Sequence, residues 1–131
     1  MKNSLKKLIL YSFATICFVQ EGWATNIDTY LDKIHSCSET MPFVKSVHKS
    51  LLQLNLSQKD VRNIIKTIEP IDRKKVQKRN RQFNGENLVY IDFITVIGKK
   101  NLQKKIYVKF SISEKNELVK LISFHKGVDN W

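Results

Sequence analysis

The stretch that decides the fold is residues 88–97, LVYIDFITVI. β-Branched and aromatic residues fill it, which favours a strand, and both alternating sets of side chains are mostly apolar. Residues 106–113, IYVKFSIS, follow with strict alternation of apolar and polar side chains, as in a half-exposed strand. Residues 118–124 predict a further strand after a short turn. The second half of the chain therefore predicts an antiparallel meander.

A fourth strand is predicted upstream of this run. Asn84-Gly85 is a strong signal for a two-residue hairpin turn, which would pair residues 74–83 with residues 88–97. Residues 74–83 are very polar, and Lys and Arg on an edge strand oppose edge-to-edge aggregation. A helix over 74–83 is the alternative.

The first half of the chain predicts helices. Ile27, Tyr30, Leu31, Ile34 and Met41 share one face at helical spacing. Pro42 then either kinks this helix or occupies the first turn of the next. Beyond it, an apolar stripe continues at helical spacing through the following residues: Val44, Val47, Leu51 and Leu54.

The clearest helix start lies at Ser57, with Asp60 three residues later as a short variant of a capping box. Val61, Ile64, Ile65 and Ile68 follow at helical spacing. Glu69-Pro70 should end this helix, because a residue before proline avoids the helical region.

Helices followed by an antiparallel meander make an α+β fold, in which N-terminal helices pack on one face of a three- to four-stranded sheet. We expect a single domain over 25–131, helical over 26–69 and β-rich over 74–126. By element order alone, this pattern resembles cystatin-like and NTF2-like rolls. A resemblance at this level implies no function.

Residues 1–24 predict a cleavable export signal. Lys2, Lys6 and Lys7 precede an apolar run over 8–19, and Gly22-Trp23-Ala24 offers the small residues that a signal peptidase selects. The apolar run is too short for a membrane-spanning helix, which needs about 20 residues. We therefore expect a periplasmic or secreted protein without a transmembrane segment in its mature chain.

Removal of this signal would leave 107 residues and change the charge and the cysteine content. Three lysines and Glu21 leave with the signal, so the formal net charge falls from +11 to +9. Cys17 also leaves, and Cys37 alone cannot form an internal disulfide. Homodimers through Cys37 or through an edge strand remain open.

The basic side chains fall in two clusters that an antiparallel meander would bring to one end of the sheet. They are Arg73, Lys74 and Lys75, and Lys99, Lys100, Lys104 and Lys105, with Lys126 at the end of the last strand. Acidic residues are expected at the opposite end: Glu86, Glu114 and Glu117. Such polarity attracts anionic partners.

Residues with the chemistry of a catalytic or metal site are sparse. His35 and Cys37 are two apart, which is poor geometry on a helix for a nucleophile and its base. No metal-ligand spacing is present, and no cofactor is expected. Asp92 lies within an apolar strand, where it either pairs with a Lys or Arg of the neighbouring edge strand or marks a pocket with Tyr90.

The sequence thus favours a small exported, non-enzymatic binding or accessory module. Its basic sheet end would contact an anionic partner, either an envelope protein or lipid. Nucleic acid does not suit an exported protein with so few stacking aromatic residues on its strands. The alternative is a small-molecule-binding or enzymatic roll, with a pocket near Asp92 and Tyr90 on the sheet face under the helices.

Overall fold

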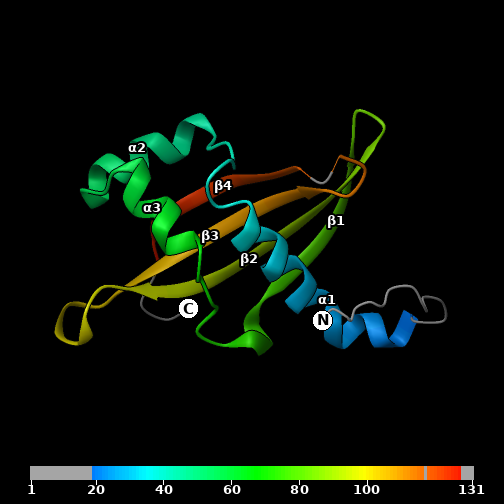
Figure 1. Ribbon diagram of the computed structural model, residues 1–131, viewed down its shortest axis with the longest axis horizontal. Coiled ribbons are helices and arrows are strands. Elements are labelled where there is room, and N and C mark those ends of the chain that lie inside the picture. Colours follow the sequence, from blue (N-terminus) through cyan, green and yellow to red (C-terminus); the bar gives the residue numbers. More distant parts are fainter. Residues whose placement is uncertain (1–18, 117, 128–131) are drawn as a thin grey trace. The chain divides into compact units, whose positions relative to one another are not determined.

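The computed structural model describes residues 19–116 and 118–127, with side chains from residue 27 onward (Figure 1). The chain forms two compact units, Met1–Tyr30 and Leu31–Trp131, and the first helix crosses the boundary between them. The elements are α1 (Val19–Ser36), α2 (Lys45–Leu54), α3 (Gln58–Ile65), the 3-10 turn η1 (Arg73–Lys75), β1 (Gln77–Phe83), β2 (Glu86–Ile97), the 3-10 turn η2 (Lys100–Leu102), β3 (Lys104–Ser113) and β4 (Leu118–Lys126).

The fold is α+β: helices precede a four-stranded antiparallel sheet in the order β1-β2-β3-β4. The predicted meander is confirmed. Residues 77–83 form a strand, so the helical alternative for 74–83 is wrong apart from the short turn η1. Asn84 and Gly85 both have positive φ, 53° and 76°, which matches the twist of a tight hairpin.

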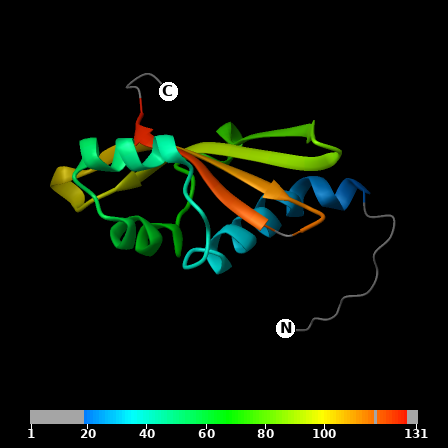
Figure 2. The ribbon, with the colours of Figure 1, turned by 90° about the horizontal axis from the view of Figure 1, so that it is seen from above.

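One face of the sheet is the core. The odd-numbered residues of β2 point to it, and register places the matching side chains of β3 and β4 beside them. These side chains are buried: Val89, Ile91, Phe93, Ile106, Val108, Phe110, Ile112, Val119, Leu121 and Phe124. Figure 2 shows α3 lying to one side of the sheet. The helical segments add their own buried side chains: Leu31, Ile34, Val47, Leu51, Val61 and Ile65.

The segment after α1 corrects the prediction for Pro42 and Met41. α1 ends at Ser36, so Met41 does not continue its stripe, although its side chain is buried. Pro42 neither kinks a helix nor begins one. Its carbonyl accepts a hydrogen bond from the Leu121 amide at 3.0 Å, and the Val44 amide donates to the Leu121 carbonyl at 3.1 Å. This segment therefore covers the outer edge of β4, and proline fits because only its carbonyl is needed.

α2 packs against β4, and α3 begins as predicted. The Ser57 hydroxyl accepts from the Asp60 amide at 3.0 Å, and the Ser57 amide donates to the Asp60 carboxylate at 2.9 Å. The helix stops at Ile65, before the predicted end at Glu69-Pro70. Residues 66–71 turn toward β2 instead: Thr95 Oγ1 donates to the Glu69 carbonyl at 2.7 Å, and the Ile71 amide donates to the Ile94 carbonyl.

The predicted export signal, residues 1–24, lies largely outside the described residues and stays a prediction. Within the described part of the chain, no helix combines the length and the apolar character that crossing a membrane requires.

The capping box gives the first testable prediction. Ser57→Ala removes the side-chain acceptor at the start of α3 and should lower the free energy of unfolding by about 1 kcal/mol. Urea denaturation measures the change. Ser50→Ala is the matched control, because the Ser50 hydroxyl only donates to the Ser46 carbonyl within α2. Equal stability of the Ser57→Ala variant and the parent would show that the box does not hold α3.

Candidate functional site

Four lysines lie in or directly after the connection between β2 and β3: Lys99 and Lys100 in the turn, and Lys104 and Lys105 at the start of β3. We call this segment the basic hairpin loop. The strands pair as far as Ile97 and Lys104, so the turn between them is short. Gly98 has φ +97°, and a Cβ there would lie 2.7 Å from the Leu102 carbonyl oxygen. The Leu102 amide closes the turn on the Lys99 carbonyl at 2.8 Å. Glycine is therefore required, and the loop has a built geometry.

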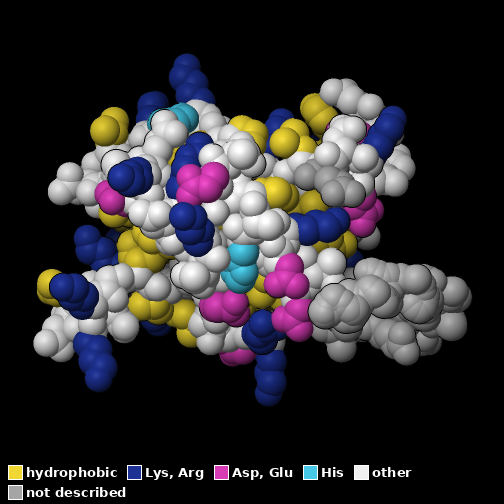
Figure 3. Space-filling view, viewed as in Figure 1, with side chains coloured by type: hydrophobic (Ala, Val, Ile, Leu, Met, Phe, Trp, Pro, Cys, Tyr) yellow, Lys and Arg dark blue, Asp and Glu magenta, His cyan; other side chains and the backbone are white. Residues whose placement is uncertain are grey.

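The four lysines of the basic hairpin loop are all exposed. Within the described part of the chain, none of them forms an ion pair with an acidic side chain. Figure 3 shows Lys and Arg side chains around the lower-left end of the molecule, where Figure 1 places this connection. These lysines therefore make the surface around the loop positive, although Asp72 lines one cavity with Lys105.

The second predicted cluster, Arg73, Lys74 and Lys75, forms η1. Asp72 caps this turn by accepting from the Lys74 amide at 3.0 Å, and Glu69 lies 3.5 Å from the Arg73 guanidinium. Lys75 and Lys105 line the same cavity of about 210 Å³. The structure therefore brings the two clusters together, but Glu69 and Asp72 offset part of the charge around η1.

The far end of the sheet carries Glu86 and Glu114, as predicted. Glu86 accepts a hydrogen bond from the Asn116 amide side chain at 2.7 Å and another from the Ser113 hydroxyl. Glu114 lies in the adjacent turn, but Lys115 is beside it. Glu117 lies outside the described residues. The expectation of one basic and one acidic end is therefore too simple, since acids also lie beside η1.

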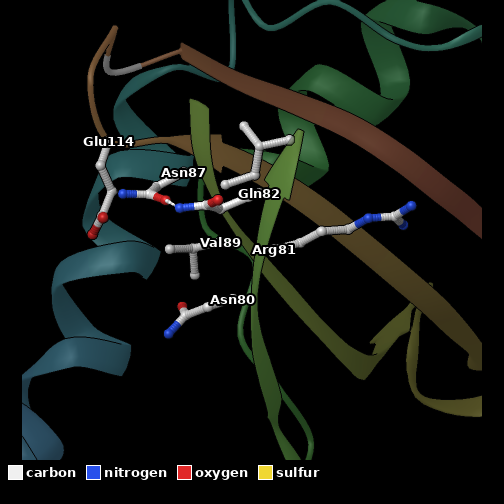
Figure 4. Close-up of a pocket in the computed structure, with 7 residues that line it drawn as sticks. Asn80, Arg81, Gln82, Asn87, Val89 and Glu114 are labelled. Carbon is white, nitrogen blue, oxygen red and sulfur yellow. Dashed lines mark hydrogen bonds between the residues drawn. The ribbon is translucent and has the colours of Figure 1, made fainter. Parts of the chain in front are cut away.

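A polar hollow of about 350 Å³ lies at this far end (Figure 4), lined by Asn80, Arg81, Gln82, Asn87, Leu88, Val89 and Glu114. The Gln82 side-chain amide donates to the Asn87 side-chain carbonyl at 3.0 Å across the β1–β2 pair. This hydrogen bond pairs two of the polar side chains that line the hollow.

An apolar groove adjoins the basic hairpin loop. It holds about 840 Å³, and we call it the hairpin groove; its lining is Leu54, Leu56, Ile64, Thr67, Ile97, Gly98, Asn101, Leu102, Gln103 and Lys104. The end of α2, the exposed side of α3 and the loop thus form its walls. Figure 3 shows apolar side chains exposed in the hollow above the lower-left end. Sequence reasoning missed the groove, because its leucines come from segments far apart in the chain.

Asp92 is the one carboxylate that is buried among the described residues, 2% exposed, and it lies on the sheet face opposite the core. Tyr107 donates its hydroxyl hydrogen bond to Asp92 Oδ2 at 3.0 Å. Arg79 of the edge strand β1 reaches to 3.9 Å from Oδ1. The predicted pairing with an edge-strand Lys or Arg is confirmed. Oδ1 is nevertheless buried without a hydrogen-bond partner.

A cavity of about 300 Å³ opens onto Asp92, lined by Gln77, Arg79, Asp92, Ile94, Tyr107, His125, Lys126 and Gly127. Two parts of the predicted pocket are wrong. Tyr90 does not line this cavity, and its ring instead carries the Lys109 ammonium 4.9 Å from its centroid. The cavity also lies on the face away from the helices, because Asp92 alternates with the buried core residues Ile91 and Phe93.

Tyr107 is the aromatic partner of Asp92, a pairing that the sequence alone does not indicate. Burial, with a smaller effect of the Asp92 charge, raises the pKa of Tyr107 to about 12. The hydroxyl therefore stays protonated and remains a donor. The His125 ring lies 5.1 Å from the Tyr107 ring. The signal for this pairing is the β2–β3 register, which places Tyr107 opposite Ile94 and diagonal to Asp92.

The remaining titratable candidates are placed elsewhere. The His35 ring donates a hydrogen bond from Nε2 to the Ile68 carbonyl at 2.7 Å, so this nitrogen is occupied by a backbone contact. Cys37 is half-buried with a free thiol. Among the residues that the structure describes, no group of three or more His, Cys, Asp or Glu side chains is placed to hold a metal ion.

Comparisons with protein-family models, with characterised protein sequences and with solved structures give no match.

The Asp92 site gives the second prediction. Tyr107→Phe leaves a buried carboxylate without its donor and should lower the free energy of unfolding by about 1–3 kcal/mol at neutral pH. Because folding raises the Tyr107 pKa from 10.0 to about 12, this hydroxyl stabilises the fold fully below pH 10.0, and the contribution is lost as pH rises through about 12. The parent should therefore lose stability over this window more steeply than the variant.

Urea denaturation between neutral pH and about pH 12 measures both effects. Tyr90→Phe is the control, because the Tyr90 ring stays under Lys109 and its hydroxyl makes no hydrogen bond in the described part of the chain. If Tyr107→Phe and Tyr90→Phe change stability equally, the Tyr107–Asp92 hydrogen bond is not the cause.

Proposed function

We propose that this protein is a small exported, non-enzymatic binding module whose basic hairpin loop contacts an anionic partner at the cell envelope. The observation that carries the proposal is the set of four exposed lysines in and beside the Gly98 turn, without an ion pair in the described part of the chain. The composition of residues 1–24 supports export to the periplasm or secretion.

The energetics favour a surface contact. Four like charges close together repel one another and destabilise the loop slightly. An anionic surface that covers them relieves this repulsion and also attracts the lysines directly. Each lysine near an anionic surface contributes roughly 1 kcal/mol, and salt screens the attraction. Lys75 extends the same positive surface toward η1, since it shares a cavity with Lys105. The expected interaction is fast to form and sensitive to ionic strength.

The third prediction reverses this charge. Changing Lys99, Lys100, Lys104 and Lys105 to Glu should abolish salt-sensitive binding to immobilised envelope components at low ionic strength. The control is a second quadruple variant with the same net charge, in which Lys45, Lys49, Lys115 and Lys120 become Glu. These control lysines are exposed and lie on α2, in the β3–β4 turn and on β4.

The comparison of these two variants separates a local site from net charge. Binding should survive in the control variant and fail in the hairpin variant, with both variants folded by circular dichroism. Equal loss in the two variants would mean that total charge, not the basic hairpin loop, attracts the partner. Full binding by the hairpin variant would overturn the proposal outright.

A second candidate function is ligand binding at Asp92, and the observation that favours it is the buried Oδ1 atom without a hydrogen-bond partner. The cavity there also presents Arg79 and Lys126. A ligand that suits both features is a small molecule with a cationic donor for the carboxylate and an anionic group for the basic side chains, as in an amino acid.

The fourth prediction uses glycine as the probe for this cavity. Titrating glycine should shift the NMR signals of His125, which lines the cavity, and Asp92→Asn should weaken binding about tenfold or more. A folded Asp92→Asn variant that binds glycine as the parent does would show that the carboxylate is not the ligand. Absence of any shift would leave the cavity with a structural role only.

A further inference from the structure

We infer that the hairpin groove receives an acidic peptide segment of a partner protein, whose apolar side chains enter the groove while its carboxylates meet the basic hairpin loop. This inference rests on the proposed function and names the class of its partner. The groove and the loop are continuous, because Lys104 lines the groove and Asn101 and Leu102 belong to the same turn as Lys99 and Lys100.

The walls of the groove are apolar and held by the fold. Leu54 and Leu56 flank Asn55, whose left-handed conformation (φ 58°) ends α2. The Asn55 amide donates to the Leu52 carbonyl, and the Leu56 amide donates to the Leu51 carbonyl at 3.0 Å. Ile64 lies on α3, which the capping box fixes at its start. Ile97 ends β2. The cleft is therefore preformed, which lowers the entropy that binding must overcome.

The size and the shape of the groove favour a peptide. Its volume of about 840 Å³ falls in the range of ligand-binding clefts. The apolar surface is recessed between the helices and the loop. Binding to a bilayer instead requires apolar side chains that protrude and insert into the membrane. Only Leu102, 77% exposed, stands out from the loop. Thr67, Asn101 and Gln103 place polar side chains along the walls, where a peptide backbone can hydrogen-bond.

Charge complementarity determines the character of the peptide. No acidic side chain lines the groove, and the adjoining lysines are without ion pairs in the described part of the chain. An apolar segment without charge would leave these lysines unmatched, and a basic segment would be repelled. An amphipathic segment with apolar anchors and flanking Glu or Asp satisfies both the groove and the loop.

The test is a selection of peptides from a random displayed library against the purified protein at low salt. Selected peptides should combine acidic residues with leucine or aromatic residues. Leu102→Gln together with Ile64→Gln should weaken the binding of a selected peptide at least about tenfold, because the peptide's anchors lose apolar contacts. Leu52→Gln is the matched control, since Leu52 is 82% exposed and does not line the groove. All variants are checked for folding by thermal denaturation.

Several outcomes overturn the inference. They are the recovery of no binding peptide, the recovery of peptides without acidic or apolar residues, and equal binding of a selected peptide by the groove variant and the Leu52→Gln control. Binding of phosphatidylglycerol vesicles that requires Leu102, without peptide binding, would assign the surface to lipid.

The inference and the proposed function fail in different experiments. If reversal of the four lysines abolishes envelope binding but the groove variant binds like the parent, the anionic contact stands and the peptide groove is wrong. If reversal of the lysines leaves envelope binding intact, the proposed function is wrong, whatever the peptide selection yields.

Discussion

The ladder between β2 and β3 is the constraint on which the rest of the structure depends. Its ten pairs run from Leu88 opposite Ser113 to Ile97 opposite Lys104. A slip of one residue would move every side chain to the other face, so burial of Phe93 and Phe110, whose rings lie 6.2 Å apart, fixes the register. The same register sets Asp92 on the opposite face and leaves residues 98–103 as a short turn that contains Lys99 and Lys100 and ends at Lys104. Core, buried carboxylate and basic hairpin loop therefore follow from one pairing.

The elements of the sheet could be predicted because their signals are local. The alternation over 106–113, the turn at Asn84-Gly85 and the cap at Ser57 each act within a few residues, and the structure confirms them. The path of Pro42 could not be predicted in this way. Its role depends on the edge of β4, about 80 residues further along the chain, where Leu121 exchanges hydrogen bonds with it and with Val44.

The candidate sites show the same difference between features set by local sequence and features set by distant parts of the chain. The four lysines lie in or beside one turn, so their proximity could be predicted from the sequence. The ion pair between Arg73 and Glu69 could not, because it depends on how the chain leaves α3. The sequence could indicate that Asp92 needs a partner. It could not select Tyr107 over Tyr90, because both alternate onto the same face and only the register places Tyr107 next to the carboxylate. The hairpin groove was out of reach, since three separate segments form its walls.

The basic hairpin loop and the Asp92 cavity differ in whether their charged side chains have partners within the protein. At Asp92 the fold supplies Tyr107 and Arg79, so the charge of a buried group is largely compensated from within. At the loop, the lysines form no ion pair in the described part of the chain, although Asp72 lines one cavity with Lys105 and Glu69 pairs with Arg73 of η1. The fold pairs its buried charge and caps its turns, whereas the four lysines in and beside the Gly98 turn form no ion pair in the described part of the chain, which supports the proposed contact with an anionic partner. The apolar groove beside the loop gives such a partner more to bind than charge alone, because salt weakens the attraction of the lysines but not the burial of apolar side chains.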